Sequence, residues 1–223
     1  MVKEGARGGW KREVEGWNFF PYSPKKVLGV NPGAIAEVHG VKHCLRATLV
    51  AEATAQVYRR LFKEFENIGE ENIRLASAAA AYHDSGRQGE EVDVFDDLSA
   101  MQAREDLAEM GVSDDQCSRC GNVISNKDAP VEGKDPVAIL LHEADCLEIQ
   151  RIGFKYDPKY LDALQTDAKG RLILTPRDGV SREQIEQEIQ DLIAKTKNLI
   201  DETKREYRKK AEEIGLVKAD LIV

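Results

Sequence analysis

Residues 33–65 read GAIAEVHGVKHCLRATLVAEATAQVYRRLFKEF, and this stretch decides the fold class. It is rich in alanine, lacks proline after Pro32, and repeats apolar residues at helical spacing. The apolar stripe consists of Leu45, Leu49, Ala53, Val57 and Leu61. We therefore predict a long helix from about Val41 onward, and an all-α helical bundle around it.

Two more helices are predicted to follow. Residues 71–82 (ENIRLASAAAAY) form a helix with an alanine-rich middle, which ends at His83 because turn-forming residues come next. A third helix begins at a cap formed by Asp96 or Asp97 and ends at Gly111. The alanines of residues 71–82 favour close packing between neighbouring helices.

The next part of the chain is predicted to be less regular. Residues 112–136 are expected to form a loop-rich insert. A compact apolar helix then resumes over residues 137–152 (VAILLHEADCLEIQRI), and Asp135-Pro136 suits its start. Beyond that helix we predict irregular structure with one short strand at residues 171–174.

A long amphipathic helix is predicted near the C-terminal end. Ser181 and Gln184 form a capping-box pattern that would start it. An apolar stripe with spacings of three and four follows: Ile185, Ile189, Leu192, Thr196, Leu199 and Thr203. Two roles stay open for this stripe, packing against the body of the protein or forming a coiled-coil seam in a homodimer.

These patterns divide the chain into three parts. Residues 1–33, punctuated by tryptophan, proline and glycine, are expected to form an irregular N-terminal arm. Residues 34–152 form the core domain, and residues 153–223 form a connecting segment and the C-terminal helix. The chain therefore carries one domain with extensions at both ends.

The composition excludes several classes of partner. The chain has 32 Lys and Arg against 40 Asp and Glu, a net charge of −8, which disfavours binding to polymeric nucleic acid. Its apolar runs, such as residues 137–141, are far shorter than the roughly 20 residues of a membrane span. The first thirty residues lack the apolar core of a secretory signal, so we expect a cytoplasmic protein with reduced cysteines.

The four cysteines offer a weak metal hypothesis. Cys117 and Cys120 in CSRC make half of a structural zinc site. The remaining two, Cys44 and Cys146, lie in other blocks of the chain and suit small buried residues. We therefore favour free thiols or a reversible disulfide over zinc at CSRC.

The chain has only four histidines, and each lies beside other potential ligands: His39, His43, His83 and His142. His39 and His43 are four residues apart and would share a helix face with Arg46. A single histidine on a helix is more often a satisfied structural residue than a ligand. Each histidine alone is therefore weak support for a site.

The order of histidines and carboxylates along the chain is harder to attribute to chance. His43, then the pair His83-Asp84, then Asp145 lie on or at the ends of predicted helices. Three helices could bring these two imidazoles and two carboxylates to one divalent ion. The sequence thus predicts a candidate metal site from His43, His83, Asp84 and Asp145.

This order resembles the HD-domain phosphohydrolase superfamily, whose first helix reads His-x-x-Arg, as in HCLR at His43–Arg46. The wider strings HGVKHCLR, HDSGRQGEEVDVFDDLSA and HEADCLEIQR are similar to the phosphodiesterase domain of the SidE effector family. The resemblance spans about residues 35–152 in three blocks. It covers neither the N-terminal arm nor the tail after Arg151.

The resemblance implies a phosphodiesterase or phosphohydrolase. SidE-like domains cleave the pyrophosphate of ADP-ribosylated ubiquitin, or remove phosphoribosyl-linked ubiquitin from serine, with two histidines and a glutamate. Carried onto this chain, the histidines are His39 and His142, and the glutamate is Glu90 or Glu91. This reading requires no cofactor, and it adds a secreted effector acting in a host cytoplasm as a second location.

Roles for these residues follow from the chemistry of phosphodiester cleavage. His39 would act as nucleophile or base and His142 as acid, with the order of the pair open. Glu90 would orient one imidazole. Arg46 and Arg87 would hold phosphate oxygens.

Two questions stay open at this level. The candidate metal site could hold a divalent ion, or its residues could form a metal-free hydrogen-bonded core that orients the catalytic pair. The alternatives to a SidE-like enzyme are a metal-dependent HD phosphohydrolase of nucleotides or related small phosphoesters, and a non-catalytic helical module that binds a partner through its C-terminal helix.

Overall fold

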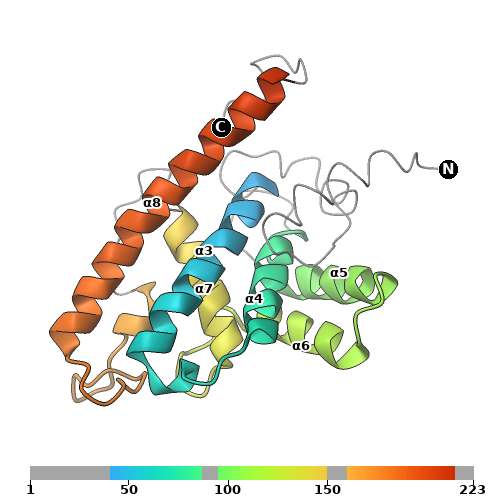
Figure 1. The fold of residues 1–223 in the computed structure, drawn as a ribbon. Helices are drawn as coiled ribbons and strands as arrows, with labels where there is room; N and C mark the ends of the chain where they lie inside the picture. The colour runs from blue at the N-terminus through green and yellow to red at the C-terminus, as the bar shows by residue number, and fades with distance from the viewer. Residues whose placement is uncertain (1–40, 87–94, 150–159, 214–223) are drawn as a thin grey trace.

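The structure, a computed structural model, describes residues 41–86, 95–149 and 160–213. Within these ranges it contains six α-helices, two short 3₁₀ turns and no strand (Figure 1). The predicted all-α fold is therefore confirmed. The N-terminal arm predicted for residues 1–33 lies outside the described residues.

Three helices form the centre of the fold: α3 (Val41–Leu61), α4 (Glu70–Tyr82) and α7 (Pro136–Ile149). All three pack against one another. Every residue of the alanine-rich segment 75–82 in α4 is buried, and most residues of α7 are buried too, including Glu143 and Glu148. Small side chains let the helices approach closely, as the sequence predicted.

A second layer consists of α5 (Asp96–Glu109) and α6 (Asp114–Ser125), which pair with each other beside α4 (Figure 1). The prediction that Asp96 or Asp97 caps α5 is wrong, because Phe95 occupies the N-cap position without a side-chain bond. Both carboxylates have other partners: Asp97 accepts from Ser125 Oγ at 3.0 Å, and Asp96 pairs with Lys127.

The helix α6 corrects the prediction of a loop-rich insert over residues 112–136. Ser113 caps it by accepting from the backbone of Gln116, and one face buries Cys117 and Cys120 in the core. Both thiols are free, so they act as small apolar residues of a helix face. Polar residues and a glycine between the buried positions hid this helix from sequence reasoning.

The strand predicted at residues 171–174 is also wrong. Only single bridges occur there, between Thr166 and Leu172 and between Phe62 and Pro176. Asp167 accepts from two backbone amides of the following residues and folds the chain into a tight turn. No neighbouring strand among the described residues is present to extend the pairing.

The C-terminal helix α8 (Arg182–Glu213) lies along one edge of the bundle (Figure 1). Ser181 Oγ accepts from the Gln184 backbone amide at 3.2 Å, so the predicted N-cap is confirmed. The first four stripe residues are buried where α8 packs against α3 and α7: Ile185, Ile189, Leu192 and Thr196. The side chains of Leu199 and Thr203 lie outside the described set, and the homodimer stays a prediction.

None of the described helices is both long enough and apolar enough to cross a bilayer. This agrees with the expectation from the short apolar runs of the sequence.

Candidate active site

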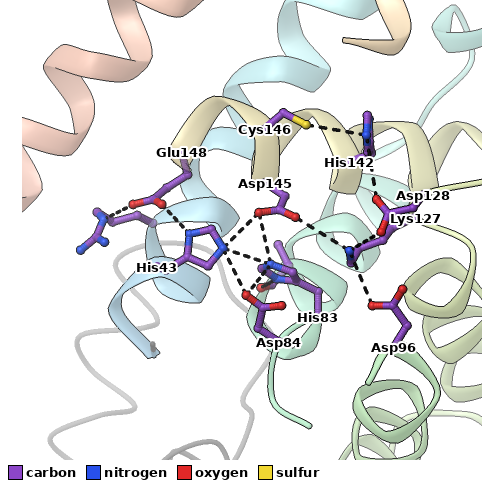
Figure 2. Close-up of polar contacts among 12 residues, drawn as sticks. His43, His83, Asp84, Asp96, Lys127, Asp128, His142, Asp145, Cys146 and Glu148 are labelled. Atoms are coloured by element: carbon purple, nitrogen blue, oxygen red, sulfur yellow. Dashed lines mark hydrogen bonds and ion pairs between the residues drawn. The ribbon is translucent and has the colours of Figure 1, made fainter. Parts of the chain in front are cut away.

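Side chains from three parts of the fold meet at one buried point (Figure 2). His43 extends from α3, His83 and Asp84 follow directly after α4, and Asp145 extends from α7. We call these four residues the central cluster. The structure thus brings together the four residues that the sequence order singled out as metal ligands.

Short distances join one polar atom from each member of the central cluster. His43 Nε2 lies 3.1 Å from His83 Nε2 and 3.1 Å from Asp145 Oδ1. Asp84 Oδ2 lies 3.5 Å from His43 Nε2 and 3.4 Å from His83 Nε2. Asp145 Oδ1 is also 3.6 Å from His83 Nε2. Both imidazoles therefore face the same two carboxylates.

The turn after α4 places the His-Asp pair. The helix ends at Tyr82, and the backbone amide of Ser85 donates to the Tyr82 carbonyl at 2.8 Å. Gly86 then donates its amide to Ser99 Oγ on α5 at 2.9 Å. A Cβ on Gly86 would lie 2.8 Å from the Ser99 nitrogen, so only glycine allows this close approach.

The hydrogen bonds on the outer ring nitrogens fix the orientation of both imidazoles. His83 Nδ1 contacts the Ala80 carbonyl oxygen at 2.8 Å, and because a carbonyl only accepts, Nδ1 carries a proton. His43 Nδ1 donates to the carboxylate of Glu148. Each ring therefore presents Nε2 to the central cluster, where the other two groups are carboxylates.

Four acceptors facing one another require a positive charge between them. Burial alone would lower the pKa of His43, but the carboxylates of Asp145 and Glu148 outweigh it and raise that pKa to about 10. Burial alone would also lower the pKa of His83, but the carboxylates of Asp84 and Asp145 outweigh it and raise that pKa. Protons supply the charge when no metal ion is bound.

The central cluster also fits a divalent ion. Ligands at about 2.0–2.1 Å from a tetrahedral zinc lie roughly 3.4 Å from one another. The distances that join His43 Nε2 and His83 Nε2 to each other and to the carboxylates of Asp84 and Asp145 run from 3.1 to 3.6 Å. The ligand atoms of His43, His83 and Asp145 all lie within 4.8 Å of one another. Outer bonds to a carboxylate and a carbonyl are also typical of metal-binding histidines. The residues present can therefore hold a metal.

Glu148 supports the central cluster from the outer side, and sequence reasoning missed it. One of its carboxylate oxygens accepts from His43, and the other accepts from Arg46 Nε. All three side chains are buried. Arg46 was predicted to hold phosphate oxygens. In the structure its Nε donates to Glu148 instead. Its position three residues after Asp145, on the same face of α7, could have revealed Glu148.

His142 lies one turn earlier on α7, in a different setting. Its side chain is 17% exposed, and its Nε2 lies 3.7 Å from Cys146 Sγ and 4.0 Å from Asp128 Oδ1. Its Nδ1 is enclosed, 3.5 Å from Asp162 Oδ1. Burial lowers the pKa of His142, although Asp162 opposes this change. His142 is therefore neutral near pH 7, whereas His43 is charged unless a metal replaces its proton.

A buried lysine connects the two settings. Lys127 Nζ lies 2.6 Å from Asp128 Oδ2, 3.6 Å from Asp96 Oδ1 and 4.0 Å from Asp145 Oδ2 (Figure 2). Burial would lower the pKa of Lys127, but these carboxylates raise it above its usual range. Lys127 therefore carries a fixed positive charge between the central cluster and the neighbourhood of His142.

Four predicted site residues lie outside the described residues: His39, Glu90, Glu91 and Arg87. Their places relative to the central cluster stay predictions. Sequence reasoning also missed Lys127, Asp128 and Asp162, which no motif contains. These residues come from the segments that were predicted to be irregular.

Comparison with known proteins gives one positive finding. A family model described as the SidE phosphodiesterase (PDE) domain matches residues 24–209, well beyond the three blocks of resemblance. No curated protein and no solved structure matches the chain. The chain belongs to the SidE phosphodiesterase domain family and is a phosphodiesterase.

Proposed function

We propose that this phosphodiesterase cleaves the phosphodiester or pyrophosphate bond of phosphoribosyl-linked or ADP-ribosylated ubiquitin. The acting groups are His39 and His142, with Glu90 or Glu91 as their carboxylate partner. One observation carries the proposal. His142, alone among the three described histidines, stands outside the central cluster and is neutral, yet shares α7 with Asp145.

Phosphodiester cleavage needs a group that attacks or activates water, and a group that protonates the leaving oxygen. A neutral imidazole can take a proton from water or attack phosphorus itself, and both acts use a free nitrogen lone pair. Because burial lowers its pKa, His142 suits this role better than the role of acid. We therefore assign His142 as nucleophile or base and His39 as acid.

The negative charge of the phosphate requires positive groups nearby. Arg87 is proposed to contact phosphate oxygens directly. Arg46 acts at one remove, since its Nε is engaged by Glu148, which in turn holds His43. Lys127 adds a second fixed positive charge on the side of His142.

A second candidate is a metal-dependent HD-type phosphohydrolase acting on nucleotides or related small phosphoesters. The close approach of ligand atoms from His43, His83 and Asp145 favours it, with Asp84 beside both imidazoles. His43, His83, Asp84 and Asp145 would hold the ion. A bound divalent ion would polarise the phosphate and lower the pKa of a bound water.

One experiment tests both candidates. The purified chain is incubated with ADP-ribosylated ubiquitin, a phosphoribosyl-ubiquitin serine peptide and a panel of nucleotides, with and without chelator, and the products are identified by mass spectrometry. Cleavage of either ubiquitin adduct that resists chelator and is lost in His142→Gln supports the first candidate. Cleavage of nucleotides alone, abolished by chelator and restored by a transition metal, supports the second.

One variant serves as the control for this experiment. Glu188→Gln breaks a solvent-accessible ion pair between α8 and Arg60 of α3 and should leave every rate unchanged. If neither ubiquitin adduct is cleaved while nucleotides are, the ubiquitin substrate is refuted.

A further inference from the structure

We propose that Asp162, fixed by Lys134, is the positioning residue for His142: it holds the proton on Nδ1 and leaves Nε2 free to act on the phosphate. This inference rests on the proposed role of His142. No motif of the sequence includes Asp162 or Lys134, and both come from segments outside the central helices.

The geometry places Asp162 at the enclosed side of the ring. Asp162 opens the 3₁₀ turn η4 (Asp162–Leu164), and its Oδ1 lies 3.5 Å from His142 Nδ1. That nitrogen is shielded from solvent and makes no hydrogen bond with any described residue. The distance is long for a hydrogen bond, as is common at catalytic histidines before substrate binds. Asp162 is therefore the acceptor that the Nδ1 proton can reach.

Lys134 prevents the carboxylate from turning away. Its Nζ lies 2.8 Å from Asp162 Oδ2, and its side chain is only 1% exposed. One oxygen of Asp162 is thus held by a buried ammonium group while the other faces the imidazole. A buried pair of this kind is costly to break, because each charge would be left without its partner.

The backbone that carries Asp162 is attached to the same helix as His142. The amide of Ala163 donates to Glu143 Oε1 at 3.0 Å, and Glu143 is the residue after His142 on α7. The turn and the imidazole are therefore both attached to α7, which fixes their relative places. This double attachment is what an orienting carboxylate needs.

His142, Glu143 and Asp162 also lie close enough to suggest a metal site. The ammonium group of Lys134 already neutralises Asp162, and Glu143 is engaged by a backbone amide. A cation among these groups would face the positive charge of Lys134. The arrangement fits an orienting role better than ion binding.

Other charged groups also act on the imidazole of His142 and decide in which direction each variant changes its pKa. Asp162, Asp128 and Asp145 favour its protonated form, whereas Lys134 and burial oppose it. Removing the carboxylate in Asp162→Asn should therefore lower the pKa of His142. Removing the ammonium in Lys134→Gln should raise it.

The first test needs no substrate. Spectra of the ¹⁵N-histidine-labelled full chain report the tautomer and pKa of each imidazole, and His142→Gln identifies the His142 signals. We expect His142 to hold its proton on Nδ1 in the native chain. In Asp162→Asn, the tautomer should shift toward Nε2–H and the pKa should fall, and in Lys134→Gln the pKa should rise. Asp178→Asn, at a 95% exposed carboxylate, is the matched control.

A native His142 with its proton on Nε2, or variants whose pKa values do not move in opposite directions, would overturn the inference. That result stands whatever substrate the enzyme takes, so it is distinct from failure of the proposed function. The second test measures kcat and KM for cleavage of phosphoribosyl-ubiquitin. Asp162→Asn should lower kcat about 100-fold with KM changed less than about threefold, and Asp162→Glu should recover part of the loss. Equal kcat in Asp162→Asn and the native chain would also refute it.

Discussion

The central cluster and the neighbourhood of His142 differ in how each holds its imidazoles. In the central cluster two rings from α3 and the end of α4 face buried carboxylates, and the pKa of each is raised. Around His142, one ring lies near solvent at the side of α7, and burial lowers its pKa. The difference teaches that burial beside carboxylates keeps one imidazole charged, whereas burial with the nearest described carboxylate 3.5 Å away keeps another neutral, as the proposed role of His142 requires.

The largest expected effect comes from breaking the support of the central cluster. Glu148→Ala leaves the buried charges of Arg46 and His43 without their shared partner. We expect a loss of about 3–5 kcal/mol in the free energy of unfolding, measured by urea denaturation. The matched surface variant Glu188→Ala removes the partner of exposed Arg60 and should cost less than about 1 kcal/mol. Equal losses would contradict the distinction between the two settings.

A substitution at His142 should lower the catalytic rate and leave the stability of the fold almost unchanged. His142→Gln keeps a polar side chain at a partly exposed position. We expect the rate of adduct cleavage to fall by roughly 10² to 10⁴, as for loss of a general acid or base, with an unfolding midpoint close to native. Retention of more than a tenth of the native rate would remove His142 from the catalytic groups.

A third variant acts on the turn that carries the His-Asp pair. In Gly86→Ala the new methyl group would meet the Ser99 backbone nitrogen at 2.8 Å and Leu98 Cβ at 2.9 Å. Backbone atoms cannot yield cheaply, so stability should fall by about 1–3 kcal/mol and the central cluster should loosen. Gly69→Ala is the control, since a Cβ there meets nothing within 4 Å.

The smallest effect concerns pH. A base must be neutral to act, and burial lowers the pKa of His142 below its ordinary value of 6.5. The acid limb of kcat/KM should therefore be centred below pH 6.5, with activity lost as the pH falls through the lowered pKa of His142. A limb centred above pH 7 would contradict the assignment of His142 as the base.

Much of the fold was predictable because its helices carry strong local patterns. The alanine-rich segments of α3 and α4 and the apolar α7 were found from composition and spacing alone. The helix α6 was missed because its buried face is made of cysteines and a few aliphatic residues within a polar sequence. Two local signals were nevertheless present: Ser113 and Gln116 form the S-x-x-Q capping-box pattern, and the buried residues of α6 recur at spacings of three and four.

The candidate site was predictable to a similar degree. The four members of the central cluster were identified from their order along the chain, because histidine, then His-Asp, then aspartate, each on or at the end of a predicted helix, suits helices that converge on one ion. Lys127 and Asp162 were not, because they reach the site through contacts between segments far apart in the sequence, and nothing in the local sequence marks such a contact.

The helix α7 carries His142 three residues before Asp145, so a single rigid rod holds both settings in register. An α-helix turns by about 100° per residue, and one amino acid inserted between these two positions would swing either of them away from its partners. The three-residue interval from His142 to Asp145 thus fixes the distance and angle between the two settings. A change of one residue in this interval would also rotate the buried residues of α7 away from α3 and α4, so the interval is tied to the packing of the core.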